Sequence, residues 1–197
     1  PGVEKIGESA FENSGLKKFE IPANIYAVGK NAFKNSELKE ISLGSVKTIG
    51  AGAFEGTELT SVTIPESVTT IGAGAFRSCT ELKNVRFRTT SLRVVDDYMF
   101  YDCTSLESIV LPEGVTRLGG YAFMNCENLS DVELPSTLEM IAVDCDLDDE
   151  DEVNYGYTFA NCTALKSIVL PDKLSYLGSF AFTNSGLVSI ELPDALV

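Results

Sequence analysis

The sequence predicts an α/β solenoid, a right-handed superhelix in which each of eight repeats contributes one parallel β-strand and a short helical turn on the opposite side. Three observations predict it: a phenylalanine recurs at a nearly fixed interval, a strand-like apolar pattern follows each copy, and 44% of the 197 residues are hydrophobic. A repeat of this length cannot bury its own apolar side chains, so neighbouring repeats must complete its core. We expect a single domain over residues 1–197.

The recurring phenylalanine follows a run of small residues, as in the segment from Val68 to Phe76. Six of the seven intervals between successive copies are 21–24 residues, and the seventh is 36, so one repeat carries about 13 extra residues. A period in this range is typical of leucine-rich solenoids. We expect the rings to lie in the core. The copies are Phe11, Phe33, Phe54, Phe76, Phe100, Phe123, Phe159 and Phe182.

A strand pattern follows each phenylalanine. A leucine comes five or six residues later, and further apolar residues come three and five positions after it, as in Leu106, Ile109 and Leu111. Residues two apart point to the same face of a strand, so this pattern predicts one buried strand face per repeat. Proline ends most of these segments, because it has no N–H group to donate to a continuing ladder.

Charge is distributed unevenly along the chain. Residues 1–98 hold 12 basic and 12 acidic side chains, whereas residues 99–197 hold 3 basic and 17 acidic ones, so the second half carries the whole net charge of −14. Such a surface repels phosphate backbones. The chain has no histidine, the usual general base, and no apolar run of the roughly 20 residues that a membrane-spanning helix needs. We therefore expect no enzyme, no nucleic-acid partner and no membrane insertion.

Four cysteines occupy one column of the predicted stack, three residues after the phenylalanine of their repeat, where the other repeats have Ser or Thr. Coils stacked about 5 Å apart would spread the thiols over roughly 15 Å, too far for the four sulfurs of a zinc site. We expect buried, reduced thiols that donate weakly to a neighbouring carbonyl, with a disulfide between neighbours as the alternative. The preceding Asn, Asp, Gly or Ser predicts a tight left-handed corner. The cysteines are Cys79, Cys103, Cys126 and Cys162.

The longest interval contains an acidic insertion at about residues 142–155, with seven carboxylates within nine residues. Carboxylates suit calcium, which would take Asp144, Asp146 and Asp148 as ligands. An EF-hand-like loop would need Gly and Glu where the chain has Asp149 and Tyr155. A solvated loop is the main interpretation; a calcium site, the only cofactor that the sequence suggests, and a contact with a basic partner are the alternatives.

Two residues before the phenylalanine, the first four repeats have Ser, Asn or Gly, whereas the last four have Tyr98, Tyr121, Tyr157 and Phe180. If the coils stack in register, these aromatic residues form a stripe away from the strand face, beside Tyr101. Either the rings cover the turns of adjacent coils, or they form a rigid patch that binds a protein or a sugar. The outward strand positions are short and mixed, without the aromatic anchors that dominate interfaces.

Neither end of the sequence has a distinct polar cap. Open solenoid ends expose core and an edge strand. We therefore expect a fragment of a longer array, or a chain whose uncapped repeats associate end to end.

The phrase L-x-x-I-x-L-P, then V-T-x-I-G, then A-F-x-x-C-x-x-L recurs along the chain, as in residues 59–82 and 106–129. It resembles the BspA-type leucine-rich repeat proteins of bacterial cell surfaces. The resemblance covers nearly the whole chain and departs from the pattern at the insertion and at an irregular fifth unit, residues 94–100. It implies the fold more strongly than the ligand.

The resemblance also carries expectations about function. Proteins of this kind look like exported adhesins or surface antigens. The resemblance therefore implies a bacterial cell-surface or secreted location and a non-catalytic module that binds a host or microbial protein or glycan. A passive structural spacer and a calcium-dependent binding module are the alternatives.

Overall fold

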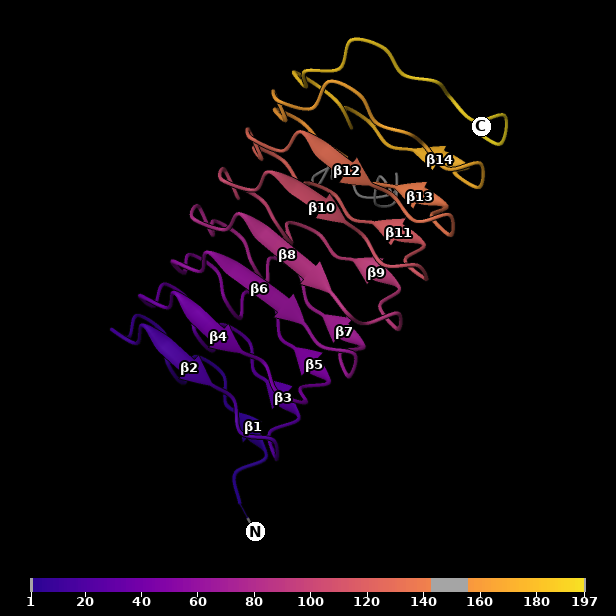
Figure 1. The fold of residues 1–197 in the computed structure, drawn as a ribbon. Helices are drawn as coiled ribbons and strands as arrows, with labels where there is room; N and C mark the ends of the chain where they lie inside the picture. Colours follow the sequence, from indigo (N-terminus) through magenta and orange to yellow (C-terminus); the bar gives the residue numbers. More distant parts are fainter. Residues whose placement is uncertain (1, 143–155, 197) are drawn as a thin grey trace, which may run out of the picture.

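A computed structural model describes residues 2–142 and 156–196 of the chain. These residues wind into a parallel-strand β-solenoid of about six turns. Successive coils stack along the sequence from the indigo N-terminal end to the yellow C-terminal end (Figure 1). Every strand pairing joins neighbouring coils in parallel, as the repeat pattern predicts.

One side of the coil, which we call the strand face, carries the strand predicted after each phenylalanine. Its middle residue points inward, as in β10, where Ile109 is buried while Ser108 and Val110 are exposed. The strands form two parallel sheets, in the orders β2-β4 and β12-β10-β8-β6. They are β2 (Lys18–Glu20), β4 (Glu40–Ser42), β6 (Ser61–Ile64), β8 (Asn84–Phe87), β10 (Ser108–Val110) and β12 (Asp131–Glu133).

A second, two-residue strand occupies the V-T-x-I segment of the coil, so the prediction of one strand per repeat is wrong. Two residues are too few to show a period, and hydrogen bonds between coils create these strands, such as Gly29 N to Ile6 O at 2.9 Å. They form the sheets β1-β3-β5-β7 and β14-β13-β11-β9. They are β1 (Lys5–Ile6), β3 (Ala27–Val28), β5 (Thr48–Ile49), β7 (Thr70–Ile71), β9 (Val94–Val95), β11 (Arg117–Leu118), β13 (Met140–Ile141) and β14 (Tyr176–Leu177).

The segment around each phenylalanine is a turn and not a helix, which corrects the predicted helical turns; the described residues contain no helix. Backbone φ is positive two residues before and two residues after each of the eight repeat phenylalanines, for example +57° at both Tyr98 and Asp102 around Phe100. Left-handed residues interrupt a right-handed helix. The N–H groups of these three residues instead donate to carbonyls of the next coil at 2.8–3.0 Å. A third ladder between coils therefore replaces intrahelical bonding.

The eight phenylalanine rings stack through the centre of the solenoid. Neighbouring ring centroids lie 5.1–5.6 Å apart with interplanar angles of 1–16°. Six rings are fully buried, whereas Phe11 and Phe182 at the two ends are partly exposed. Because each inner ring packs between rings of two other coils, the stability of one coil depends on its neighbours.

The predicted number of eight repeats is too high for complete turns. Six coils form a strand on the strand face, whereas residues 166–170 and 188–192, which continue the apolar pattern, form none. A parallel strand exists only where a neighbour offers matching backbone groups. The phenylalanine stack nevertheless continues to Phe182. The last coils therefore keep the core packing of the repeat and lose its strand pairing.

Candidate binding surfaces

The predicted aromatic residues stack on the turn side of the second half of the solenoid. We call Tyr98, Tyr121, Tyr157 and Phe180 the aromatic column. Successive centroids lie 4.7, 5.4 and 4.9 Å apart, with interplanar angles of 4–25°. Tyr101 meets the first ring edge-on at 5.8 Å. The tyrosines are half-buried and Phe180 is 48% exposed, so the column presents a continuous aromatic edge to solvent.

The backbone of the aromatic column is left-handed, with φ between +34° and +58°. Two earlier repeats place Gly52 and Gly74 at this position, also with positive φ. A side chain in this conformation costs on the order of 1 kcal/mol relative to glycine, and a stacked aromatic pair returns about 0.5–1.5 kcal/mol. The two effects are similar in size, so stability alone does not explain why four aromatic residues stand where glycine fits.

Stacking determines which parts of the rings remain accessible. The faces of Tyr121 and Tyr157 are covered by neighbouring rings. At the N-terminal end of the column, the Arg77 guanidinium lies 5.5 Å from the centroid of Tyr98 and 5.0 Å from that of Tyr101. Burial raises the pKa of Tyr98, and the nearby positive charge of Arg77 offsets only part of this rise. Ring edges therefore form the accessible surface of the tyrosines in the column.

The four described cysteines are buried free thiols in one column. Each Sγ donates to the carbonyl oxygen of the phenylalanine in the preceding coil at 3.1–3.2 Å. Burial raises the pKa of Cys79 to about 11 and that of Cys162 to about 12, and it raises the pKa values of Cys103 and Cys126 as well. Buried, protonated thiols are poor nucleophiles. The hydrogen bonds of the column instead join successive coils.

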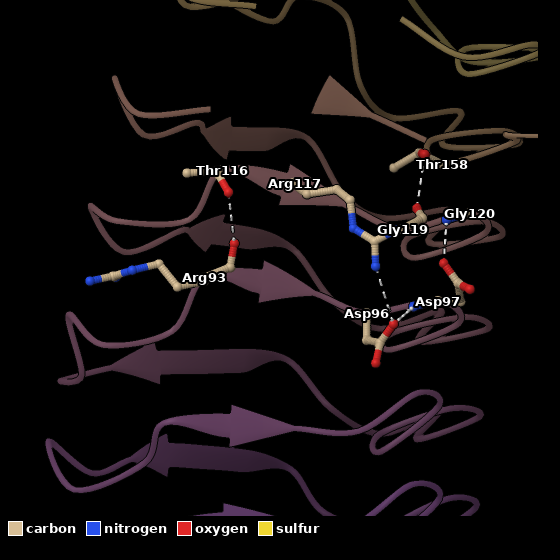
Figure 2. A network of polar contacts seen from close by, with 8 residues as sticks. All are labelled: Arg93, Asp96, Asp97, Thr116, Arg117, Gly119, Gly120 and Thr158. Atoms are coloured by element: carbon tan, nitrogen blue, oxygen red, sulfur yellow. Dashed lines mark hydrogen bonds and ion pairs between the residues drawn. The ribbon is translucent and has the colours of Figure 1, made fainter. Parts of the chain in front are cut away.

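The irregular fifth unit is held by a polar network (Figure 2). The Asp97 carboxylate accepts a hydrogen bond from Gly120 N at 2.8 Å, and Asp96 Oδ1 accepts one from Asp97 N at 3.0 Å. Arg117 lies 3.8 Å from Asp96, and Thr158 donates to a carbonyl of the preceding coil at 3.1 Å. Paired carboxylates are candidates for acid–base chemistry. Here the hydrogen bond from Gly120 to Asp97 and the ion pair of Arg117 with Asp96 join adjacent coils, which gives the two aspartates a structural role.

The residues predicted to bind calcium, Asp144, Asp146 and Asp148, lie outside the described residues. In residues 2–142 and 156–196, no cluster of three or more His, Cys, Asp or Glu side chains could hold a metal ion. No helix in the same residues is long and apolar enough to cross a membrane.

Stacked parallel strands, a continuous phenylalanine core and a 21–24-residue period define a leucine-rich repeat solenoid. The family described as BspA type leucine rich repeat region matches residues 1–50, 47–145 and 152–197 in six copies, and the chain belongs to this family. No curated protein sequence matches the chain.

Several solved structures resemble the solenoid. A leucine-rich repeat protein from Eubacterium ventriosum is 30% identical with a TM-score of 0.77, over 93% of this chain and 46% of its own. A leucine rich cell surface protein from Faecalibacterium prausnitzii is 28% identical with a TM-score of 0.57, over 91% and 52%. The pneumococcal vaccine antigen PcpA is 25% identical with a TM-score of 0.66, over 98% and 57%. The chain thus spans about half the length of these proteins.

Proposed function

We propose that the chain is a non-catalytic protein-binding module of a bacterial cell-surface protein and that the aromatic column is its ligand-binding surface. Family membership and the likeness to a cell surface protein and to a vaccine antigen support the location. The observation that carries the binding role is the aromatic column itself, three half-buried tyrosines and the exposed Phe180 fixed in register on a left-handed backbone where Gly52 and Gly74 stand in other coils.

Aromatic side chains dominate the energetics of protein interfaces, because they bury a large area at a small cost in conformational entropy. The rings of Tyr98, Tyr121 and Tyr157 are already held by stacking, so little freedom remains to be lost when a ligand binds. Their edges combine apolar carbon with a phenol group, a mixture that suits a protein surface. A glycan ligand would gain less, because the inner ring faces are covered.

The test compares a triple variant, Tyr98→Gly, Tyr121→Gly and Tyr157→Gly, with the unmodified chain on an array of extracellular-matrix proteins and glycans. Glycine already occupies this position in the repeats of Phe54 and Phe76, as Gly52 and Gly74, so the left-handed backbone is retained. The matched control is Thr63→Gly, an exposed position on the strand face. We expect the unmodified chain and the control to bind at least one matrix protein and the triple variant to lose that binding.

Two results would contradict the proposal. If the triple variant keeps the binding of the unmodified chain, the aromatic column covers the turns and serves packing alone. If the unmodified chain binds nothing on the array, a passive spacer is the better description. Far-UV circular dichroism of the triple variant, compared with the unmodified chain, separates lost binding from lost fold.

A further inference from the structure

Two arginines stand side by side on the strand face, at β8. Arg86 is an outward residue of the strand, and Arg88 follows two positions later; both side chains are exposed. Arg88 N donates to Ile64 O of β6 at 2.9 Å, so the pairing of β6 with β8 holds both residues in register. Side chains two positions apart on a strand point to the same side, about 7 Å from each other. The two guanidinium groups therefore form one basic patch, which we call the arginine pair.

Both members of the arginine pair depart from the repeat. The position of Arg86 holds Glu, Ser, Thr or Val in the other repeats, whereas the position of Arg88 holds proline in six of them and Gly44 in one. Any residue except proline could supply the N–H group that continues the ladder at Arg88. Strand pairing therefore does not explain why a guanidinium group stands at either position.

The arginine pair has no counter-ion on the described part of the chain. Elsewhere on the strand face a cation meets a carboxylate of the next coil, as Lys18 meets Glu40 at 2.7 Å. Arg86 instead lies between Thr63 of β6 and Val110 of β10. Within residues 2–142 and 156–196, neither guanidinium forms an ion pair or a hydrogen bond. Two adjacent cations are thus left uncompensated in a chain whose net charge is −14.

A hollow of about 330 Å³ lies beside the arginine pair, where the ladder between β4 and β6 is interrupted. Its lining contains no carboxylate. Arg88 lines it together with three hydroxyl-bearing residues, Ser42, Ser61 and Thr63. Hydroxyl and guanidinium groups both donate hydrogen bonds, and the planar guanidinium fork matches the two oxygens of a carboxylate. The hollow and the arginine pair together therefore suit an anionic ligand.

The surrounding charges limit the form of that ligand. Carboxylates stand on the strand face on both sides of the arginine pair, Glu20 and Glu40 on β2 and β4, and Asp131 and Glu133 on β12. A long polyanion that crosses from coil to coil, such as a sulfated glycan, would be repelled there. An extended protein segment avoids this repulsion, because it can carry two carboxylates at alternate positions, also about 7 Å apart, and no charge beyond them.

We propose that the arginine pair binds an extended acidic segment of a partner protein, one in which Asp or Glu stands at two alternate positions. The segment lies along β8, and its two carboxylates accept hydrogen bonds from Arg86 and Arg88. The carboxylate at Arg88 also reaches the hydroxyl groups of the hollow. This surface is on the strand face, whereas the aromatic column is on the turn side, so either proposal can fail while the other stands.

The probe is the peptide acetyl-Thr-Glu-Thr-Glu-Thr amide, titrated into the full chain and followed by the backbone amide NMR signals of β6 and β8. We expect shifts centred on these two strands. Exposed ion pairs are individually weak, so the double variant Arg86→Gln and Arg88→Gln should weaken binding by about tenfold. The matched control removes the same charge from two exposed lysines beside β3 and β5, as Lys30→Gln and Lys47→Gln, and should leave the affinity unchanged.

A second peptide tests the spacing of the carboxylates apart from their charge. In acetyl-Thr-Glu-Glu-Thr-Thr amide the two glutamates are adjacent, so they point to opposite sides of an extended chain. We expect this peptide to bind more weakly than the first. Equal binding of the two peptides, or equal weakening by the lysine variant, would show general attraction between charges and would overturn the proposal. Absence of binding by the first peptide, or tighter binding of a heparin tetrasaccharide, would overturn it too.

Discussion

Replacing a central ring of the phenylalanine stack tests whether the solenoid is stabilised coil by coil. Phe100 is fully buried and stacks on Phe76 at 5.6 Å and on Phe123 at 5.4 Å. Truncating a buried phenylalanine to alanine costs about 3–5 kcal/mol, and the two lost stacked contacts contribute about 0.5–1.5 kcal/mol each to that loss. We expect Phe100→Ala to lower the free energy of unfolding by about 5 kcal/mol, which is a large part of the stability of an ordinary domain.

The end of the same stack provides the matched comparison. Phe11 is partly exposed and packs on Phe33 at 5.1 Å and on Phe19 at 5.2 Å. Its alanine variant leaves a site that water already reaches in part, so we expect a loss of about 1–2 kcal/mol. Urea unfolding followed by far-UV circular dichroism measures both values, since the chain has no tryptophan to serve as a probe.

Hydrogen exchange locates the effect within the array. In a stack stabilised by nearest neighbours, Phe100→Ala should reduce the protection of the ladder amides of Phe76 and Phe123, and that of Phe33 should change little. Equal losses of stability for the central and the terminal variant, or a uniform fall in protection along the chain, would refute the nearest-neighbour argument.

Three further predictions concern the thiols, the corners and the insertion. Burial raises the pKa of Cys79 to about 11 from 9.0, so above pH 9 the unfolded chain loses this proton while the folded chain keeps it. The thiol's contribution to the free energy of unfolding is therefore complete below pH 9 and falls by about 1.4 kcal/mol per pH unit between pH 9 and pH 11. Cys79→Ser should make the plot of unfolding free energy against pH less steep by that amount. An unchanged slope would disprove the prediction. Asn125 has φ of +63°, so Asn125→Ala should destabilise the chain by about 1 kcal/mol more than Asn125→Gly in thermal melts, and equal melting temperatures would count against a strained corner. Calcium at about 1 mM should leave the melting temperature unchanged if residues 142–155 form a solvated loop, whereas a rise would favour Asp144, Asp146 and Asp148 as ligands.

Local rules account for the parts of the structure that the sequence predicted. The inward side chains of the strands after each phenylalanine could be assigned because a strand alternates its faces with a period of two, as Ile109 and Val132 show. The corner residues Asn125 and Asn161 could be assigned because few residue types tolerate positive φ. The thiols could be placed in successive coils because the cysteines occupy the same position in successive repeats.

Other features depend on contacts between coils and were therefore missed or miscounted. The turns around Phe100 were predicted as helical as part of the solenoid, and only the ladder to the next coil shows that their N–H groups are used there. The second strands are too short to be recognised alone. The end of the strand ladder at β12 likewise has no signature in the sequence, since Ile168 and Ile109 occupy the same repeat position.

The sequence by itself determined the repeat, the phenylalanine core, the parallel stacking and the family, because each follows from residue types at a fixed period. The tertiary structure decided which edges pair, which ring faces are covered and where the strand ladder ends. Those properties belong to pairs of coils, and the geometry of a pair is set by the packing of both partners together.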